Sequence, residues 1–97
     1  MKYSFEDLKG KNCVITGGFG VIGMALTRGL AESGVNLAVI GRNPATPDKA
    51  KAIADEFGIK CIGISASVTD KAQLELAKEQ IHNEIGKIDF LINCAGG

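Results

Sequence analysis

Residues 16–23 read Thr-Gly-Gly-Phe-Gly-Val-Ile-Gly; they follow the apolar run Cys13–Thr16 and open a helical pattern. Gly18, Gly20 and Gly23 satisfy the spacing G-x-G-x-x-G, which is a weak signal alone but a much stronger one between a strand and a helix. Glycines there let the backbone turn tightly and approach a diphosphate, while the helix N-terminus offers unpaired N–H groups to its negative charge. The stretch therefore predicts a dinucleotide-binding turn.

The alternative is a glycine-rich turn that serves only the packing of the helix on the strand. The chain has 13 glycines in 97 residues, which is about twice the usual frequency. Four of the 13 fall within these eight residues. This concentration favours the binding interpretation.

Outward from the turn, short apolar runs alternate with helical patterns. After Cys13–Thr16 the apolar runs are Val35–Ile40, Ile59–Ile64 and Ile88–Ile92. They lack polar alternation, as parallel strands covered on both faces do. Three helices are expected between them: from Gly20 to Ser33, from a cap at Thr46 to Gly58, and from Thr69 or Asp70 to Gly86.

The order of these elements determines the expected fold class. A β-α-β-α-β-α-β order with right-handed crossovers predicts an α/β fold of the Rossmann type, a doubly wound parallel sheet with strand order 3-2-1-4. Residues 1–97 are expected to form one domain. The inward face of the first helix is expected to carry Ile22, Ala25, Leu26 and Leu30.

Composition argues against several classes of partner. Eleven basic residues balance eleven acidic ones, so there is no broad positive face for nucleic acid or an anionic membrane. No apolar run reaches the ~20 residues that span a bilayer, and the N-terminal segment lacks the apolar region of a signal peptide. We expect a cytoplasmic protein.

Metal binding and catalysis by this chain alone are not expected. Cys13, Cys61 and Cys94 are far apart and surrounded by aliphatic residues, which is typical of small buried hydrophobic residues. The single histidine, His82, lies in a polar helical stretch without a catalytic partner. We expect it to be a solvated surface residue.

The chain resembles the short-chain dehydrogenases/reductases along essentially its whole length. Five segments match that family in order and spacing: Leu8-Lys9-Gly10-Lys11, the Thr16-Gly17 turn, Gly41-Arg42-Asn43, Ser67-Val68-Thr69-Asp70, and Ile88 to Gly96. The resemblance implies an enzyme that transfers hydride between NADP(H) or NAD(H) and a carbonyl or alcohol substrate. It also implies that residues 1–97 are the incomplete N-terminal, cofactor-binding half of such an enzyme.

The resemblance assigns roles to single residues as well. Gly17 through Gly23 would hold the diphosphate, Val68 would flank the adenine, and Asn93, Ala95 and Gly96 would line the ribose side. Together with the motif, this gives an expected cofactor-binding set of Gly17, Gly18, Phe19, Gly20, Ile22, Gly23, Arg42, Asn43, Ser67, Val68, Asn93, Ala95 and Gly96.

Two positions depart from the family pattern. The common family turn has glycine where this chain has Val21, and the spelling T-G-x-x-G-x-x-G is typical of the extended branch. The Asn93-x-Ala95-Gly96 ending favours the shorter branch, and the combination resembles its D-mannonate oxidoreductase-like members. Ser67 stands where relatives often place an aspartate that binds the adenine amino group, so adenine contacts are expected to be weaker or differently made.

The catalytic serine, tyrosine and lysine of the family, the last two in a Tyr-x-x-x-Lys helix, lie beyond the fourth strand. The only tyrosine here is Tyr3, followed four residues later by Asp7, so we expect no catalytic residue in this chain and no activity from it alone. A non-catalytic nucleotide-sensing or interaction module on the same fold stays open as the alternative. A native mass close to that of this chain would favour the module.

The end of the second strand bears on the choice of cofactor. NAD-selective sites place an acidic residue about 20 residues past the glycines, whereas this chain has Gly41 there, followed by Arg42 and Asn43. Nothing repels a 2′-phosphate at that position, and Arg42 can pair with one. We expect NADP(H) over NAD(H); the alternative is a solvated arginine beside a tight turn.

The fourth strand bears on association. Phe90, Leu91 and Ile92 are expected on an unpaired sheet edge, which is a template for pairing with another chain. The third helix is expected to expose further apolar surface, with Leu76 beside Ile81 and Ile85. We expect a homo-oligomer with contacts through Ile88 to Cys94, the third helix, or both; the alternative is a marginally stable monomer.

Overall fold

The computed structural model describes residues 8–17, 19–67 and 69–94. Over these residues four strands alternate with three helices: β1 (Asn12–Thr16), α1 (Val21–Glu32), β2 (Asn36–Gly41), α2 (Thr46–Phe57), β3 (Cys61–Ser65), α3 (Lys71–Glu84) and β4 (Phe90–Asn93). The strands are all parallel, in the order β3-β2-β1-β4. The predicted fold class and strand order are confirmed, and the strand limits differ from the predicted ones by two residues or fewer.

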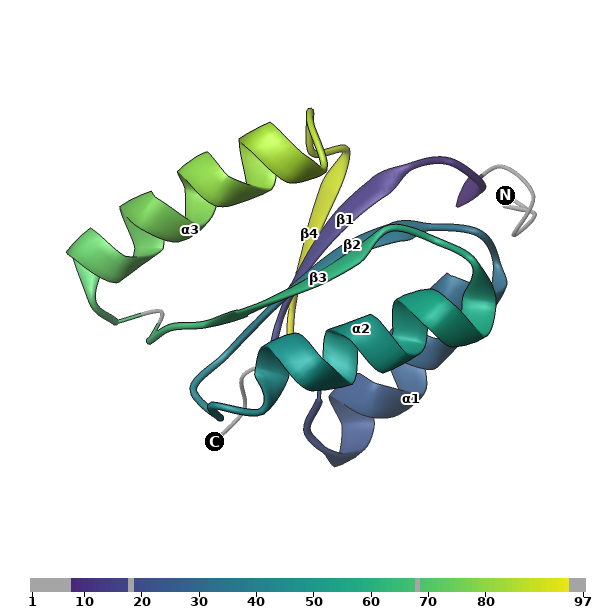
Figure 1. The fold of residues 1–97 in the computed structure, drawn as a ribbon, viewed down its shortest axis with the longest axis horizontal. Coiled ribbons are helices and arrows are strands. Elements are labelled where there is room, and N and C mark those ends of the chain that lie inside the picture. The colour runs from purple at the N-terminus through teal and green to yellow at the C-terminus, as the bar shows by residue number, and fades with distance from the viewer. Residues whose placement is uncertain (1–7, 18, 68, 95–97) are drawn as a thin grey trace.

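The helices cover both faces of the sheet, α1 and α2 on one face and α3 on the other (Figure 1). The crossovers through α1 and α2 step toward one edge of the sheet, and the crossover through α3 returns to the other edge. Because such crossovers are right-handed, the reversal of direction places α3 on the opposite face. The strand order reverses between β1 and β4, and ligands of open α/β sheets bind at the carboxyl ends of such strands.

Alternate residues along the strands supply two hydrophobic cores. The core under α1 and α2 contains Cys13, Ile15, Leu37, Val39 and Cys61 from the strands with Leu30, Ala31, Ala50 and Ile53 from the helices. The core under α3 contains Val14, Ala38, Ile40 and Ile64 with Ala77, Ile81 and Ile85. Since both faces of the central strands β1 and β2 are buried, these strands appear in the sequence as continuous apolar runs.

The buried face of α1 differs from the predicted one. Ala25 and Leu26 were expected to face inward, but both are exposed, Leu26 by 36%. The residues of α1 that the structure shows as buried are Gly23, Thr27, Leu30 and Ala31, of which only Leu30 was expected. Three of these are small and four residues apart, so they form a stripe that lets the helix backbone lie close to the sheet.

The first turn of α2 packs directly on β3 at Gly63. Thr46, expected as the helix cap, is instead the first residue of α2, and Ala45 is the cap. The Thr46 hydroxyl is buried and donates to the Asn43 carbonyl oxygen at 2.6 Å. A Cβ atom at Gly63 would lie 2.6 Å from the Thr46 carbonyl carbon and 2.8 Å from Pro47 Cα. The close approach of α2 to β3 therefore depends on a strand position without a side chain.

Asparagine side chains tie the strands together at the amino edge of the sheet. Asn12 Nδ2 donates to the Lys87 carbonyl oxygen at 2.8 Å, and the Asn12 backbone N–H donates to Asp89 Oδ2 at 2.8 Å. Asn36 Nδ2 donates to Asn12 Oδ1 at 3.2 Å, and Asn36 Oδ1 accepts from the Lys60 N–H at 3.1 Å. This ladder links β4, β1, β2 and β3 at the edge opposite the glycine turn.

Candidate functional site

The turn after β1 presents the N-terminus of α1 at the carboxyl edge of the sheet. Gly17 has a φ of 69°, a left-handed conformation that favours glycine, and its N–H donates to the Ile40 carbonyl oxygen at 2.8 Å. Gly20 caps α1 with extended backbone, and no side chain forms a capping hydrogen bond there. The first N–H groups of α1 are left for a ligand, which is the arrangement that binds phosphate.

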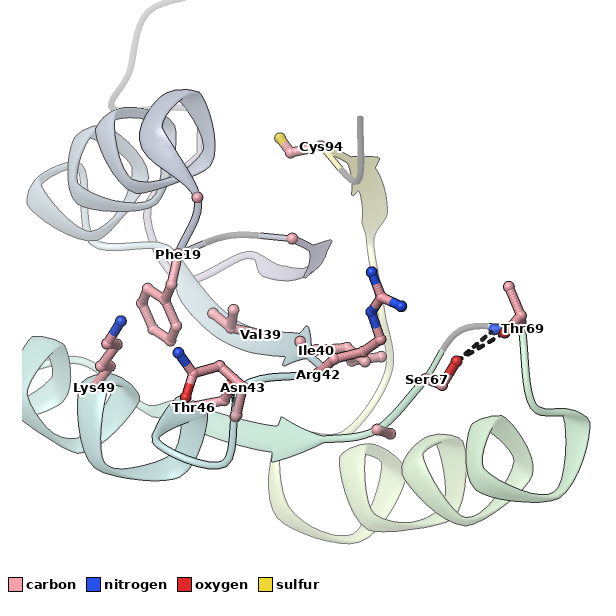
Figure 2. Close-up of a pocket in the computed structure, with 14 residues that line it drawn as sticks. Phe19, Val39, Ile40, Arg42, Asn43, Thr46, Lys49, Ser67, Thr69 and Cys94 are labelled. Carbon is pink, nitrogen blue, oxygen red and sulfur yellow. Dashed lines mark hydrogen bonds between the residues drawn. The ribbon is translucent and has the colours of Figure 1, made fainter. Parts of the chain in front are cut away.

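A cavity of about 470 Å³ opens beside this turn (Figure 2). Its described wall comes from the turn, the carboxyl ends of β2 and β3, the start of α2 and the residue after β4. Six residues of the predicted cofactor-binding set line it: Gly17, Phe19, Gly20, Arg42, Asn43 and Ser67. The fold therefore brings residues from three separate chain segments into one pocket at the point where the strand order reverses.

The turn after β2 is held by hydrogen bonds that do not involve the Arg42 guanidinium. Asn43 Oδ1 accepts from the Ala45 N–H at 2.8 Å, and the Asn43 carbonyl oxygen accepts from the Thr46 hydroxyl at 2.6 Å. The Arg42 carbonyl oxygen accepts from Ser65 Oγ at 3.5 Å. Within the described ranges the Arg42 guanidinium has neither a hydrogen bond nor an ion pair, so it is available to a ligand.

Polar contacts fix the segment after β3. The Ser67 N–H donates to Gln73 Oε1 at 2.8 Å, and the Ser67 hydroxyl shares a 2.8 Å hydrogen bond with the Thr69 hydroxyl. Asp70 then caps α3 by accepting from the Gln73 N–H at 3.1 Å, as predicted for the start of that helix. At the position where relatives often have an aspartate, Ser67 thus offers a hydroxyl group. This hydroxyl is already hydrogen-bonded to the hydroxyl of Thr69.

The other predicted site residues are not part of the described cavity lining or lie outside the described ranges. Ile22 and Gly23 are in the first turn of α1, and Gly23 is buried. Asn93 ends β4 next to Thr16 of β1, and the Thr16 hydroxyl donates to Asn93 Oδ1 at 2.8 Å. Four predicted site residues fall outside the part of the chain that the structure describes: Gly18, Val68, Ala95 and Gly96.

Sequence reasoning missed more than half of the described wall. The additional lining residues are Val39, Ile40, Gly41, Thr46, Lys49, Ala66, Thr69 and Cys94. Thr46 and Lys49 are three residues apart and so share one face of α2. This three-residue spacing, directly after the turn that follows β2, was the sequence signal that could have identified both residues.

The charges of the wall favour an anionic ligand. Arg42 and Lys49 line the cavity, and no aspartate or glutamate belongs to its described lining. A nicotinamide dinucleotide carries a diphosphate, and NADP(H) carries a further phosphate on the adenosine ribose. Two cations and a helix N-terminus without a side-chain capping hydrogen bond are groups that bind phosphates well.

The cysteines differ in their surroundings. Burial raises the pKa of the Cys61 thiol to about 12, and burial followed by the nearby Cys94 raises the pKa of the Cys13 thiol to about 12. These two are inert core residues at neutral pH, as predicted. Cys94 is only partly buried, and it lines the cavity as well as packing against the core.

Other functional groups are sparse in the described part of the chain. His82 is exposed on α3, as expected. Within residues 8–17, 19–67 and 69–94, no three histidine, cysteine or acidic side chains are grouped so that they could hold a metal ion. Among the same residues, no helix has the length and apolar character needed to cross a membrane.

A second cavity, of about 600 Å³, lies between α3 and the sheet. Its described lining is mainly apolar and includes Val14, Leu74, Ile81, Ile88 and Leu91. Leu91 of the edge strand β4 is 64% exposed, and Leu76 of α3 is 68% exposed. Ile81 and Ile85, expected on the exposed surface beside Leu76, are instead buried against the sheet. This groove and the adjoining edge are apolar surface of the kind that packs against another segment or chain.

Known proteins are similar to this chain over almost its whole length. The family model described as short chain dehydrogenase matches residues 11–97. The uncharacterized oxidoreductase UxuB of Bacillus subtilis is 43% identical over 96 residues, which are 95% of this chain and 33% of UxuB.

Solved structures with bound cofactors are also similar. The L-sorbose reductase of Gluconobacter frateurii, complexed with NADPH and L-sorbose, matches with a TM-score of 0.85 and 26% identity over 93% of this chain and 35% of its own. A proposed D-mannonate oxidoreductase of Haemophilus influenza with bound NAD matches with a TM-score of 0.84 and 31% identity over 96% of this chain and 34% of its own. The chain spans about a third of the length of these proteins.

Proposed function

The chain belongs to the short-chain dehydrogenase family, and from that membership we propose that its glycine-turn cavity binds NADP(H) or NAD(H). The observation that carries the proposal is the cavity itself, which joins the N-terminus of α1, where no side chain forms a capping hydrogen bond, to two cations that have no ion-pair partner in the described part of the chain. In the proposed complex the diphosphate lies over Gly17–Gly23. The adenosine extends toward the ends of β2 and β3, where Asn43 and Ser67 line the cavity.

We further propose that these 97 residues are the cofactor-binding part of an enzyme that transfers hydride to or from a carbonyl or alcohol. The similar proteins named as oxidoreductases are about three times as long. The sequence contains no Tyr-x-x-x-Lys segment, so the chain alone is proposed to bind the dinucleotide without turning over a substrate. Calorimetric titration with NADPH and NADH tests the binding proposal, and saturable heat with neither would overturn it.

Replacing Arg42 with alanine should separate the two cofactors. The guanidinium has no partner among the described residues, and a 2′-phosphate would give it a charge-assisted, two-pronged contact. We expect the affinity for NADPH to fall about 10-fold, the equivalent of one such contact, while the affinity for NADH stays the same. Calorimetry on both variants measures the two constants; an equal loss for both cofactors would remove the proposed phosphate role of Arg42.

We also propose that the chain associates through β4, the α3 groove, or both. Leu91 is 64% exposed and lines the groove beside a sheet edge that no other described strand pairs with. Wild-type chain at tens of micromolar is expected to sediment as a dimer or larger species, and Leu91→Lys is expected to shift it toward the 10.1 kDa monomer because a lysine on an edge strand opposes pairing.

The matched control is Leu76→Lys, which places the same charge on the exposed face of α3. Leu76 is 68% exposed and does not line the groove. Dissociation by Leu91→Lys alone supports the edge, and dissociation by Leu76→Lys alone moves the contact to the outer face of α3. A wild-type chain that is already monomeric would contradict the proposal.

A further inference from the structure

The first turn of α2 forms one wall of the dinucleotide cavity. Thr46 and Lys49 both line it, because residues three apart lie on the same face of a helix. Thr46 is only 1% exposed and its hydroxyl is bound to the Asn43 carbonyl oxygen, so this turn is anchored to the loop that follows β2. Lys49 itself is exposed. The anchored backbone of this turn fixes the point from which its side chain extends.

The same helix turn leaves little room for an acidic residue at the end of β2. A Cβ atom on Gly41 would lie 3.1 Å from Thr46 Oγ1 and 3.9 Å from Thr46 Cγ2. A longer side chain at that position would have to displace a buried, hydrogen-bonded threonine. A side chain at the position where NAD-selective sites place their carboxylate would therefore press on the first turn of α2, and Lys49 lies on that same helix turn.

Lys49 and Arg42 are both unpaired, although pairing is possible elsewhere on this surface. Arg28 is exposed as well, yet it binds Glu56 through two hydrogen bonds of 2.6 and 3.0 Å. No carboxylate in the described ranges forms an ion pair with Lys49 or Arg42. Figure 2 shows the two side chains in one pocket, Lys49 beside Phe19 and Asn43, and Arg42 on the other side of Asn43.

We propose that Lys49 is a second specificity-determining residue of this site and that it binds, with Arg42, the phosphate on the adenosine 2′-ribose position of NADP(H). The inference rests on the proposed dinucleotide function. It assigns α2, as well as the turn after β2, to cofactor selection. A dianionic phosphate between an ammonium and a guanidinium satisfies both cations, and neither NAD(H) nor its diphosphate offers a group at that point.

The competing role for Lys49 is a contact with the diphosphate, which both cofactors share. Calorimetric titrations of wild type, Lys49→Ala and Lys49→Arg with NADPH, NADH, 2′,5′-ADP and 5′-AMP distinguish the two roles. The matched control is Lys51→Ala, a lysine that is exposed on the same helix and does not line the cavity. The two adenosine fragments report on the ribose end alone, because they lack the nicotinamide half.

Lys49→Ala is expected to weaken NADPH and 2′,5′-ADP binding about 10-fold, to leave NADH and 5′-AMP unchanged, and to be largely rescued by Lys49→Arg. Lys51→Ala is expected to bind all four ligands like wild type. Equal losses for NADPH and NADH, or no loss in Lys49→Ala, would overturn the inference while leaving dinucleotide binding intact. A wild-type chain that binds neither dinucleotide would overturn the proposed function, and the inference with it.

Discussion

Gly63→Ala is expected to destabilise the chain by about 3 kcal/mol or more, the upper end for overpacking of a filled core. A Cβ atom there would overlap the Thr46 carbonyl oxygen and would lie 2.6 Å from its carbon and 2.8 Å from Pro47 Cα. All three are backbone atoms, which cannot rotate away as a side chain can. The start of α2 would have to lift off β3, and it would take the buried Thr46 hydroxyl and the cavity wall with it.

Urea unfolding followed by circular dichroism measures this effect, and Gly29→Ala is the control. Gly29 lies inside α1, and a Cβ atom there meets no heavy atom within 4 Å. Alanine is favoured over glycine in a helix by about 1 kcal/mol, so this variant should unfold at a higher urea concentration than wild type. If Gly63→Ala unfolded at the same midpoint as wild type, the proposed close packing of α2 on β3 would be wrong.

The sheet could be predicted because its evidence is local in the sequence. Each strand is a continuous apolar run, and each predicted helix ends at Gly34, Gly58 or Gly86, all of which have positive φ in the structure. Right-handed crossovers and the usual topology then gave the strand order. The orientation of α1 could not be predicted in this way, because small residues, not the larger Leu26, face the sheet where the backbones approach closely.

The residues of the candidate site also differ in whether a local sequence pattern could predict them. Gly17, Gly20, Arg42 and Ser67 were accessible to sequence reasoning because each lies shortly after the end of a strand, and parallel strands end at one edge of the sheet. Lys49 lines the cavity from α2, whose first turn packs on Gly63, and no local pattern reports this contact between segments. The tolerance for side chains at single glycines is likewise a property of the packed structure.

Gly20 shows this difference, and its replacement gives the largest expected effect on binding. Gly20 has φ −74° and ψ 178°, which any residue adopts, and among the described atoms a Cβ atom there would meet only the Gly17 carbonyl oxygen, at 3.6 Å. The free chain therefore has room for a side chain at this position. The proposed diphosphate does not, because it must approach the N-terminus of α1 over the same exposed backbone.

We expect Gly20→Val to weaken NADPH and NADH equally, by about 100-fold, or about 2.7 kcal/mol of binding free energy, with Gly20→Ala intermediate. The stability of the free chain should fall by no more than about 1 kcal/mol, since valine is a poorer helix cap than glycine. Calorimetry and urea unfolding on the same samples measure both quantities. An equal loss of affinity for both cofactors would distinguish Gly20 from Arg42 and Lys49. Replacing either of those residues is expected to weaken only the binding of NADPH. Unchanged dinucleotide affinity in Gly20→Val would mean that the diphosphate does not lie over this turn, because the valine side chain would otherwise exclude it.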